Sequence, residues 1–159
     1  MPKHVEKRIL KHTPEQMFDL VADVARYPEF LPWCLASRIV SRHDDKFVAD
    51  LVIGFKLVRE RFTSEVMLTP HERIDVRYTK GPLKYLENHW QFLDHPDGCT
   101  IDFYVEFEFK SAVLQNLIGA LFGEAVRRMV RAFETRADEL YGTKPTGVLS
   151  SQLKPQSSK

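Results

Sequence analysis

Cysteine is scarce in this sequence of 159 residues, and long apolar runs and an excess of either charge are absent. The two cysteines, Cys34 and Cys99, lie far apart and belong to no Cys-x-x-Cys or Cys/His spacing. This argues against a zinc site or a disulfide framework and favours a reducing compartment. The 23 basic and 22 acidic side chains nearly cancel, so no global field attracts the protein to DNA or to an anionic membrane.

The sequence has no segment typical of targeting or of membrane insertion. Residues 1–7 contain no apolar signal-peptide core, and no run of about 18 apolar residues occurs. We therefore expect a cytoplasmic protein whose membrane contact, if any, is peripheral. The length fits one domain, expected at residues 1–141, and residues 142–159, rich in Ser, Pro, Lys and Gln, are expected to form a disordered tail.

Catalytic and metal-binding patterns are also missing. None of the six histidines pairs at metal-ligand spacing, and no Ser/His/Asp or Cys/His arrangement is visible. His43, His71 and His95 fall in polar turns, and His89 is predicted to face outward. We therefore expect neither enzyme activity nor a metal or cofactor. A polyketide cyclase or aromatase stays an alternative, because such an enzyme could work through shape and a few polar groups.

Two short helices are predicted after an extended segment at residues 5–12. The sequence Thr13-Pro14-Glu15-Gln16 has the pattern of a helix start, with Thr as the N-cap, Pro at the first helical position and Gln three residues after the cap. Pro28 and Pro32 limit the next helix to a turn or two.

Residues 34–110 alternate between apolar and polar side chains, which is the period of half-buried strands. The clearest case is the segment 101–110, where Ile, Phe, Val, Phe and Phe alternate with polar side chains. Similar alternation occupies residues 35–40, 47–55, 62–68, 74–78 and 86–92. With the first segment this makes about seven strands, mostly consecutive, and predicts an antiparallel meander.

A final helix of about 45 Å is predicted from Ser111 to Tyr141, long enough to lie across the entire sheet. Gly119 and Gly123 each cost about 1 kcal/mol relative to Ala inside a helix. Close approach to the sheet or a ligand, a helix bend, or helix packing would each explain them. The apolar stripe of this helix is predicted to consist of Leu114, Ile118, Phe122, Ala125, Met129, Phe133, Ala137 and Leu140.

Apolar side chains gather at one end of the predicted meander. Because alternate turns of a meander lie at the same end, the segments 54–58 and 80–83 belong together, and the long helix begins at that end. The segment 27–33 leads into the same end. We therefore predict an apolar mouth or membrane contact formed by Phe30, Leu31, Trp33, Phe55, Leu57, Leu83, Val113, Leu117 and Leu121.

Four stretches of the sequence resemble a known family. They are 24–34 (VARYPEFLPWC), 62–66 (FTSEV), 81–83 (GPL) and 90–92 (WQF). Over residues 3–141 the chain is similar to the coenzyme Q-binding protein and ribosome-association toxin branch of the START-domain (polyketide cyclase-like) family. The resemblance implies an α+β helix-grip fold. In this fold a curved seven-stranded antiparallel sheet wraps around a long C-terminal helix, with two short helices after the first strand.

The resemblance also implies a cavity that holds ubiquinone (coenzyme Q) or another polyisoprenoid for respiration, with a peripheral location at the inner membrane. A quinone carrier needs mostly apolar walls and a few polar groups. Ordinary core packing is the alternative for each wall residue. From the inward alternation we predict ligand contacts from Leu51, Ile53, Phe62, Val66, Val76, Trp90, Phe92, Phe103, Val105, Phe107, Ile118, Phe122 and Met129, with Ser64 and Asn88 as polar groups.

A ribosome-associated regulator is the second function that the resemblance implies. Arg127, Arg128 and Arg131 form a basic strip on the predicted exposed face of the long helix, where RNA or phospholipid could bind. Glu124 and Glu134 lie three or four residues from these arginines. A solvated, salt-bridged helix surface is therefore the alternative.

Overall fold

The computed structural model describes residues 3–55 and 58–142, without the side chains of residues 55 and 58. The chain forms one seven-stranded sheet in the order β1-β7-β6-β5-β4-β3-β2, and every strand pair is antiparallel. The predicted meander is therefore confirmed, with the first strand closing onto the last. The strands are β1 (Lys3–Leu10), β2 (Cys34–His43), β3 (Lys46–Phe55), β4 (Val58–Thr69), β5 (Arg73–Lys80), β6 (Leu83–His95) and β7 (Gly98–Phe109).

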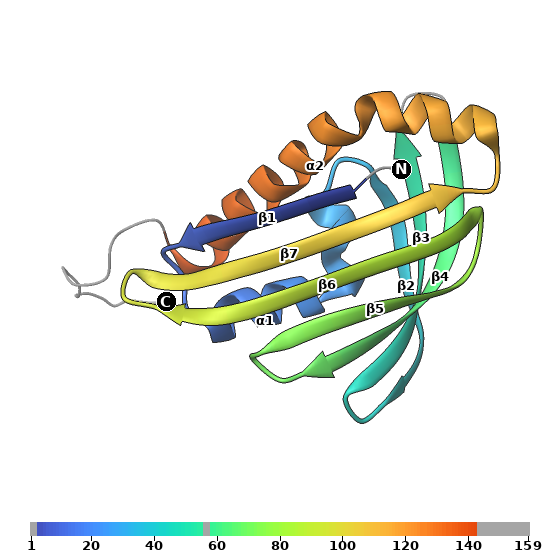
Figure 1. The fold of residues 1–159 in the computed structure, drawn as a ribbon. Coiled ribbons are helices and arrows are strands. Elements are labelled where there is room, and N and C mark those ends of the chain that lie inside the picture. The colour runs from blue at the N-terminus through green and yellow to red at the C-terminus, as the bar shows by residue number, and fades with distance from the viewer. Residues whose placement is uncertain (1–2, 56–57, 143–159) are drawn as a thin grey trace.

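The sheet is strongly curved, and the final helix lies across its concave side (Figure 1). This helix, α2 (Ala112–Tyr141), has the predicted bounds, and the Ser111 side chain caps its first turn by accepting a hydrogen bond from the Leu114 N–H. The sheet and α2 form the two layers of the domain. The helix-grip arrangement implied by the resemblance is confirmed.

The two predicted short helices follow β1. They are α1 (Pro14–Ala22) and a 3₁₀ helix, η1 (Val24–Glu29). The predicted capping box is present, because the Gln16 N–H donates to Thr13 Oγ1 at 3.1 Å and the Thr13 N–H donates to Gln16 Oε1 at 3.0 Å. The buried face of α1 includes Met17, Phe18 and Val21, and it fills one end of the sheet's concave side.

The C-terminal half of α2 is firmly packed. The Phe133 ring lies edge-on to the rings of Tyr27, Phe30 and Trp90, with centroids 5.5, 5.2 and 5.4 Å away. Near the last turn, His12 Nε2 lies 2.9 Å from Asp138 Oδ1. These contacts attach one end of the helix to the turn after β1, to the η1 region and to β6, and close the core there.

Two side chains of α2 lie in other surroundings than predicted. Leu140 was predicted in the apolar stripe but is 51% exposed. The stripe continues from buried Ala137 to Tyr141, four residues later, which packs against the core instead. Glu134 does not pair with the arginine strip; its carboxylate accepts a hydrogen bond from Arg8 of β1 at 2.6 Å. Glu124 does pair with Arg128, at 2.7 Å, as predicted.

The glycines of α2 are not explained by close packing. A Cβ atom at Gly119 would meet nothing within 4 Å, and one at Gly123 would meet only the end of the Arg127 side chain. By contrast, Gly98 begins β7 with φ +146°, where a Cβ would lie 2.1 Å from the Leu10 carbonyl oxygen. Only glycine fits at position 98, because the atoms that a Cβ would meet belong to the backbone.

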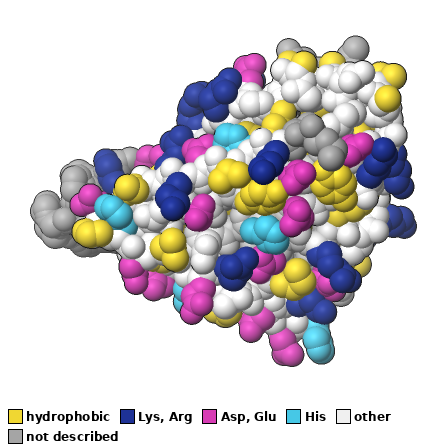
Figure 2. Space-filling view, in the orientation of Figure 1, with side chains coloured by type: hydrophobic (Ala, Val, Ile, Leu, Met, Phe, Trp, Pro, Cys, Tyr) yellow, Lys and Arg dark blue, Asp and Glu magenta, His cyan; other side chains and the backbone are white. Residues whose placement is uncertain are grey.

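The outer face of the sheet is mixed in charge. Figure 2 shows acidic and basic side chains interspersed over it, with hydrophobic groups between them. Among the described residues, no helix is long and apolar enough to cross a bilayer. The mixed charge of this face agrees with the near balance of basic and acidic residues in the sequence.

Substitution of the two kinds of glycine gives opposite expected results. Gly98→Ala should lower the free energy of unfolding by at least about 2 kcal/mol, because the new methyl group meets fixed backbone in a left-handed conformation. Gly119→Ala should raise it by about 1 kcal/mol, because alanine is the better helix former and the space is open. Urea unfolding followed by circular dichroism checks both, and a Gly98→Ala protein as stable as the parent would contradict the geometry.

Candidate functional site

A cavity of about 300 Å³ lies between the concave face of the sheet and α2. Its size falls at the lower end of the range of small-molecule pockets, about 300 to 1,000 Å³. It is partly open, and its lining comes from α1, η1, the segment between η1 and β2, strands β3 to β7 and α2. The cavity therefore joins most elements of the fold and is the main candidate for a ligand site.

The cavity walls are almost entirely apolar. Trp90 and Phe103 stand edge to face with centroids 4.5 Å apart, and Phe107 contacts Phe122 of α2 at 5.1 Å. Such aromatic pairs give rigid walls with little loss of side-chain freedom on ligand binding. The apolar lining consists of Val21, Val24, Leu31, Trp33, Ala49, Leu51, Ile53, Phe62, Val66, Ile74, Val76, Pro82, Leu83, Leu86, Trp90, Phe103, Val105, Phe107, Phe109, Ile118, Leu121, Phe122, Ala125, Val126, Met129 and Phe133, with Tyr27 beside them.

Ser64 supplies an unsatisfied polar group in this wall. The residue is only 4% exposed, and its hydroxyl has no hydrogen-bond partner among the described residues. A buried hydroxyl without a partner costs about 1 to 3 kcal/mol. A protein interior normally avoids this cost, so the hydroxyl is available to a water molecule or to a ligand.

Asn88 is a second polar group, and the protein holds it in place. Its Nδ2 donates to the Tyr104 carbonyl oxygen at 2.9 Å, and its Oδ1 accepts from Trp90 Nε1 at 3.3 Å. A primary amide has two N–H donors, so one N–H remains after the bond to Tyr104. Asn88 can therefore donate one hydrogen bond into the cavity without losing its support.

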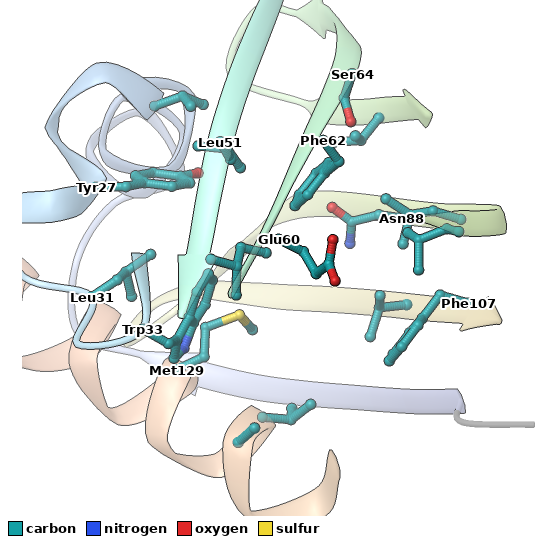
Figure 3. A pocket seen from close by; sticks show the side chains of 18 of the residues that line it. Tyr27, Leu31, Trp33, Leu51, Glu60, Phe62, Ser64, Asn88, Phe107 and Met129 are labelled. Carbon is teal, nitrogen blue, oxygen red and sulfur yellow. The ribbon is translucent and has the colours of Figure 1, made fainter. Parts of the chain in front are cut away.

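Glu60 is the third polar group and was not predicted. It lies on β4 opposite Ile53 and lines the cavity, with its carboxylate pointing into the same space as the Asn88 amide (Figure 3). The period-2 alternation of β4 already places Glu60 on the same face as Phe62 and Ser64. It was missed because only uncharged residues were considered as wall positions.

The structure places nearly all residues predicted as ligand contacts around this one space. The exception is Phe92, which does not line the cavity. The Phe18 ring of α1 covers it edge-on at 5.7 Å, because α1 fills that end of the sheet. The residues that do line the cavity are Leu51, Ile53, Phe62, Ser64, Val66, Val76, Asn88, Trp90, Phe103, Val105, Phe107, Ile118, Phe122 and Met129. Their role in binding a ligand stays a prediction.

The residues predicted to form the mouth divide into four groups. Leu31, Trp33, Leu83 and Leu121 line the cavity itself, and Leu31 and Leu83 are fully buried, so these two are wall rather than rim. Phe30 does not line the cavity itself: its ring packs edge-on against the cavity residue Phe133 and lies under the Arg136 guanidinium, so its role at a mouth stays a prediction.

The other predicted mouth residues lie near the start of α2 or have side chains that the structure does not describe. Val113 is 76% exposed and Leu117 is 40% exposed, so the first turns of α2 do present apolar side chains to the outside. The side chains of Phe55 and Leu57 lie outside the described residues. Apart from Phe30, the predicted mouth residues that are not buried in the described part of the chain are therefore Trp33 and Leu121 at the cavity and Val113 and Leu117 at the exposed start of α2.

The arrangement offers no reactive group of the kinds used in covalent or metal catalysis. Burial raises the pKa of the Cys34 and Cys99 thiols to about 11, which keeps them protonated and unreactive at neutral pH. No cluster of three or more potential metal ligands occurs among residues 3–55 and 58–142. The cavity is suited to holding an apolar molecule by shape and by a few hydrogen bonds.

Comparison with known proteins identifies related sequences. Residues 10–134 match the family described as polyketide cyclase / dehydrase and lipid transport. The chain is 39% identical over 137 residues to the ribosome association toxin RatA of Rickettsia prowazekii, covering 84% of this chain and 94% of that protein. It is also 39% identical over 145 residues to the mitochondrial coenzyme Q-binding protein COQ10 homolog B of Xenopus laevis, covering 88% of this chain and 59% of that protein.

Solved structures share the same architecture. An 18 kDa protein of Caulobacter crescentus is 36% identical, with a TM-score of 0.74, and the match covers 90% of this chain and 100% of that one. An aromatase/cyclase from Streptomyces sp. R1128 has a TM-score of 0.75 at 14% identity, covering 87% of this chain and 93% of that one. At such low identity the second likeness concerns the fold alone.

Replacement of Ser64 tests whether its hydroxyl is unsatisfied in the ligand-free protein. Ser64→Ala should raise the free energy of unfolding by about 1 kcal/mol, because it removes a buried polar group that has no partner. Ser37→Ala is the matched control, since the Ser37 hydroxyl donates to the Val24 carbonyl oxygen at 2.7 Å, and its loss should lower stability by about 1 kcal/mol. Urea unfolding of delipidated protein measures both. Destabilisation by Ser64→Ala would mean that the hydroxyl has a partner.

Proposed function

This chain belongs to the polyketide cyclase / dehydrase and lipid transport family, and we propose that it binds ubiquinone or a related polyisoprenoid in the cavity under α2. The observation that carries the proposal is an apolar cavity of about 300 Å³ whose described wall contains three strongly polar side chains, Glu60, Ser64 and Asn88. Apolar walls with few polar groups are what a lipid with a small polar head requires. The name of the Xenopus relative, a coenzyme Q-binding protein, supports the same ligand class.

The head of the ligand lies beside the polar side chains in this proposal, and the tail fills the apolar remainder. Each buried methylene of such a tail contributes about 0.8 kcal/mol. A tail too long for the cavity leaves it near the start of α2, where Val113 and Leu117 are exposed and Leu121 lines the wall. The same apolar turns give a peripheral contact with the inner membrane, from which the protein takes up or to which it delivers the lipid.

The proposed role is to chaperone or deliver the lipid for respiratory electron transport rather than to transform it. The cavity contributes shape and hydrogen bonds, and neither cysteine of the chain lines it. The relatives reported above are named as a binding protein and a toxin, which supports a binding role.

A charge placed in the cavity wall should expel the ligand. Phe107 faces the cavity and contacts Phe122, so Phe107→Arg introduces a long charged side chain into an almost entirely apolar wall and into the space that the ligand would occupy. We expect co-purified lipid to fall at least about tenfold relative to the parent protein, which corresponds to a loss of about 1.4 kcal/mol or more. Mass spectrometry of organic extracts, after expression in quinone-rich cells, measures the cargo.

Val5→Arg is the control for Phe107→Arg. Val5 is 60% exposed on β1, so the same new charge reaches water and should leave the cargo unchanged. Circular dichroism verifies that both variants are folded. Extracts of the parent protein that contain no isoprenoid lipid would contradict the proposed ligand.

Ribosome association is a second candidate, because the Rickettsia relative is a ribosome association toxin that matches over 94% of its length. The side chains of Arg127 and Arg131 are exposed on the outer face of α2, next to the Arg128–Glu124 ion pair. A basic strip of this kind can contact RNA phosphates. This surface is separate from the cavity, so the two candidate functions do not exclude each other.

Charge reversal on α2 tests the ribosome contact. The triple change of Arg127, Arg128 and Arg131 to Glu should abolish co-sedimentation with the large ribosomal subunit, because repulsion replaces three phosphate contacts. A triple reversal of Lys7, Arg61 and Lys84, which are exposed on the sheet, changes the net charge equally and should leave binding intact. If the parent protein stays in the supernatant at low salt, the chain has no such contact.

A further inference from the structure

The polar side chains of the cavity differ in the hydrogen bonds that they can make. This difference bears on the chemical form of the ligand, and the inference drawn from it rests on the proposed binding of a prenylated quinone. A quinone head carries two carbonyl oxygens, which only accept hydrogen bonds. Its reduced form, the hydroquinone, carries two hydroxyl groups, which donate and accept. A wall that offers mainly acceptors or mainly donors therefore distinguishes the two forms.

Glu60 is an acceptor. An ionised carboxylate has two oxygens and no hydrogen to donate. The described residues provide no hydrogen bond or ion pair to this carboxylate, which points into the cavity (Figure 3). A hydroxyl group of the ligand would satisfy it with a charge-assisted hydrogen bond. A carbonyl oxygen in the same position would bring two electron-rich groups together in an apolar space.

Ser64 and Asn88 are the other two strongly polar side chains in the described wall of the cavity. The Ser64 hydroxyl, buried and without a partner among the described residues, can donate or accept. The remaining N–H of Asn88 can only donate, since an N–H carries no acceptor lone pair. A hydroxyl group can donate to Glu60 and accept from Asn88, whose side chains point into the same space (Figure 3), and Ser64 can bond to either form of the head. A carbonyl oxygen can accept from Asn88 or Ser64 but makes no hydrogen bond with the Glu60 carboxylate.

We propose that the cavity binds the reduced, hydroxyl-bearing form of a prenylated quinone in preference to the oxidised form, and that Glu60 is the residue that sets this preference. The hydroquinone gains a hydrogen bond to the carboxylate. The quinone loses that bond and leaves the half-buried carboxylate without a partner among the described residues. One charge-assisted hydrogen bond corresponds to about tenfold or more in affinity.

The preference can be measured on the parent protein alone. A geranyl-substituted 1,4-benzoquinone and its hydroquinone are the probes, titrated under argon into delipidated protein and followed by calorimetry. We expect the hydroquinone to bind at least about tenfold more tightly than the quinone. The two probes share the same tail, so a difference in affinity reports on the head alone.

Glu60→Gln assigns the preference to the carboxylate. Glutamine has nearly the same shape, but its amide can donate to a carbonyl oxygen as well as accept from a hydroxyl. The preference should fall to within about threefold, mainly because the quinone binds better. Glu87→Gln is the matched control, because Glu87 lies on β6 with a side chain that is 60% exposed, and this variant should keep the full preference.

The possible results separate this inference from the proposed function. Tighter binding of the hydroquinone, lost in Glu60→Gln and kept in Glu87→Gln, supports the inference. Equal affinity for both probes, or tighter binding of the quinone, overturns the inference and leaves the carrier function standing. Loss of the preference in both variants also overturns it, since the effect would then follow net charge. Binding of neither probe overturns the proposed function itself.

Discussion

The attachment of α2 at its C-terminal end is the contact on which the site depends. Phe133 lies among Tyr27, Phe30 and Trp90, and His12 meets Asp138 one turn further on. These contacts hold the helix at one end of a sheet that curves away from it. The sheet is concave beneath the helix, and the side chains of the N-terminal half of the helix do not fill the space between the two. The cavity is this space.

The same geometry explains why the polar groups are few and why they matter. Inward positions of the strands face an interior that water enters poorly, so each polar side chain there must find a partner or remain costly. The protein provides hydrogen-bond partners for one N–H and for the oxygen of the Asn88 amide. It leaves the Ser64 hydroxyl without a partner among the described residues. A site of this kind is less stable when empty than a filled core would be. Its unsatisfied groups are the means by which it can distinguish one apolar molecule from another.

Local patterns predicted much of this arrangement correctly. The capping box at Thr13 and the alternation of β7 are properties of short segments, and they persist in the structure because no tertiary contact opposes them. Phe92 shares the inward alternation of Trp90, yet α1 covers it, and no pattern within β6 could indicate where another element would lie. Glu60 differs from Phe92, because the alternation of β4 does place it on the inward face. Only its charge favoured a position on the solvent-exposed face.

The sequence by itself determined the seven strands, their antiparallel order, the long final helix and the face of each element that would be apolar, because these follow from periodicity and from short-range sterics. Only the tertiary structure decided that the apolar faces of the sheet and α2 stay partly apart, that Phe30 packs into the core, and that Leu31 and Leu83 become wall. Whether two apolar surfaces close on each other depends on the curvature of the whole sheet and on where the helix is attached. Many contacts between residues far apart in the chain together set both the curvature and the point of attachment.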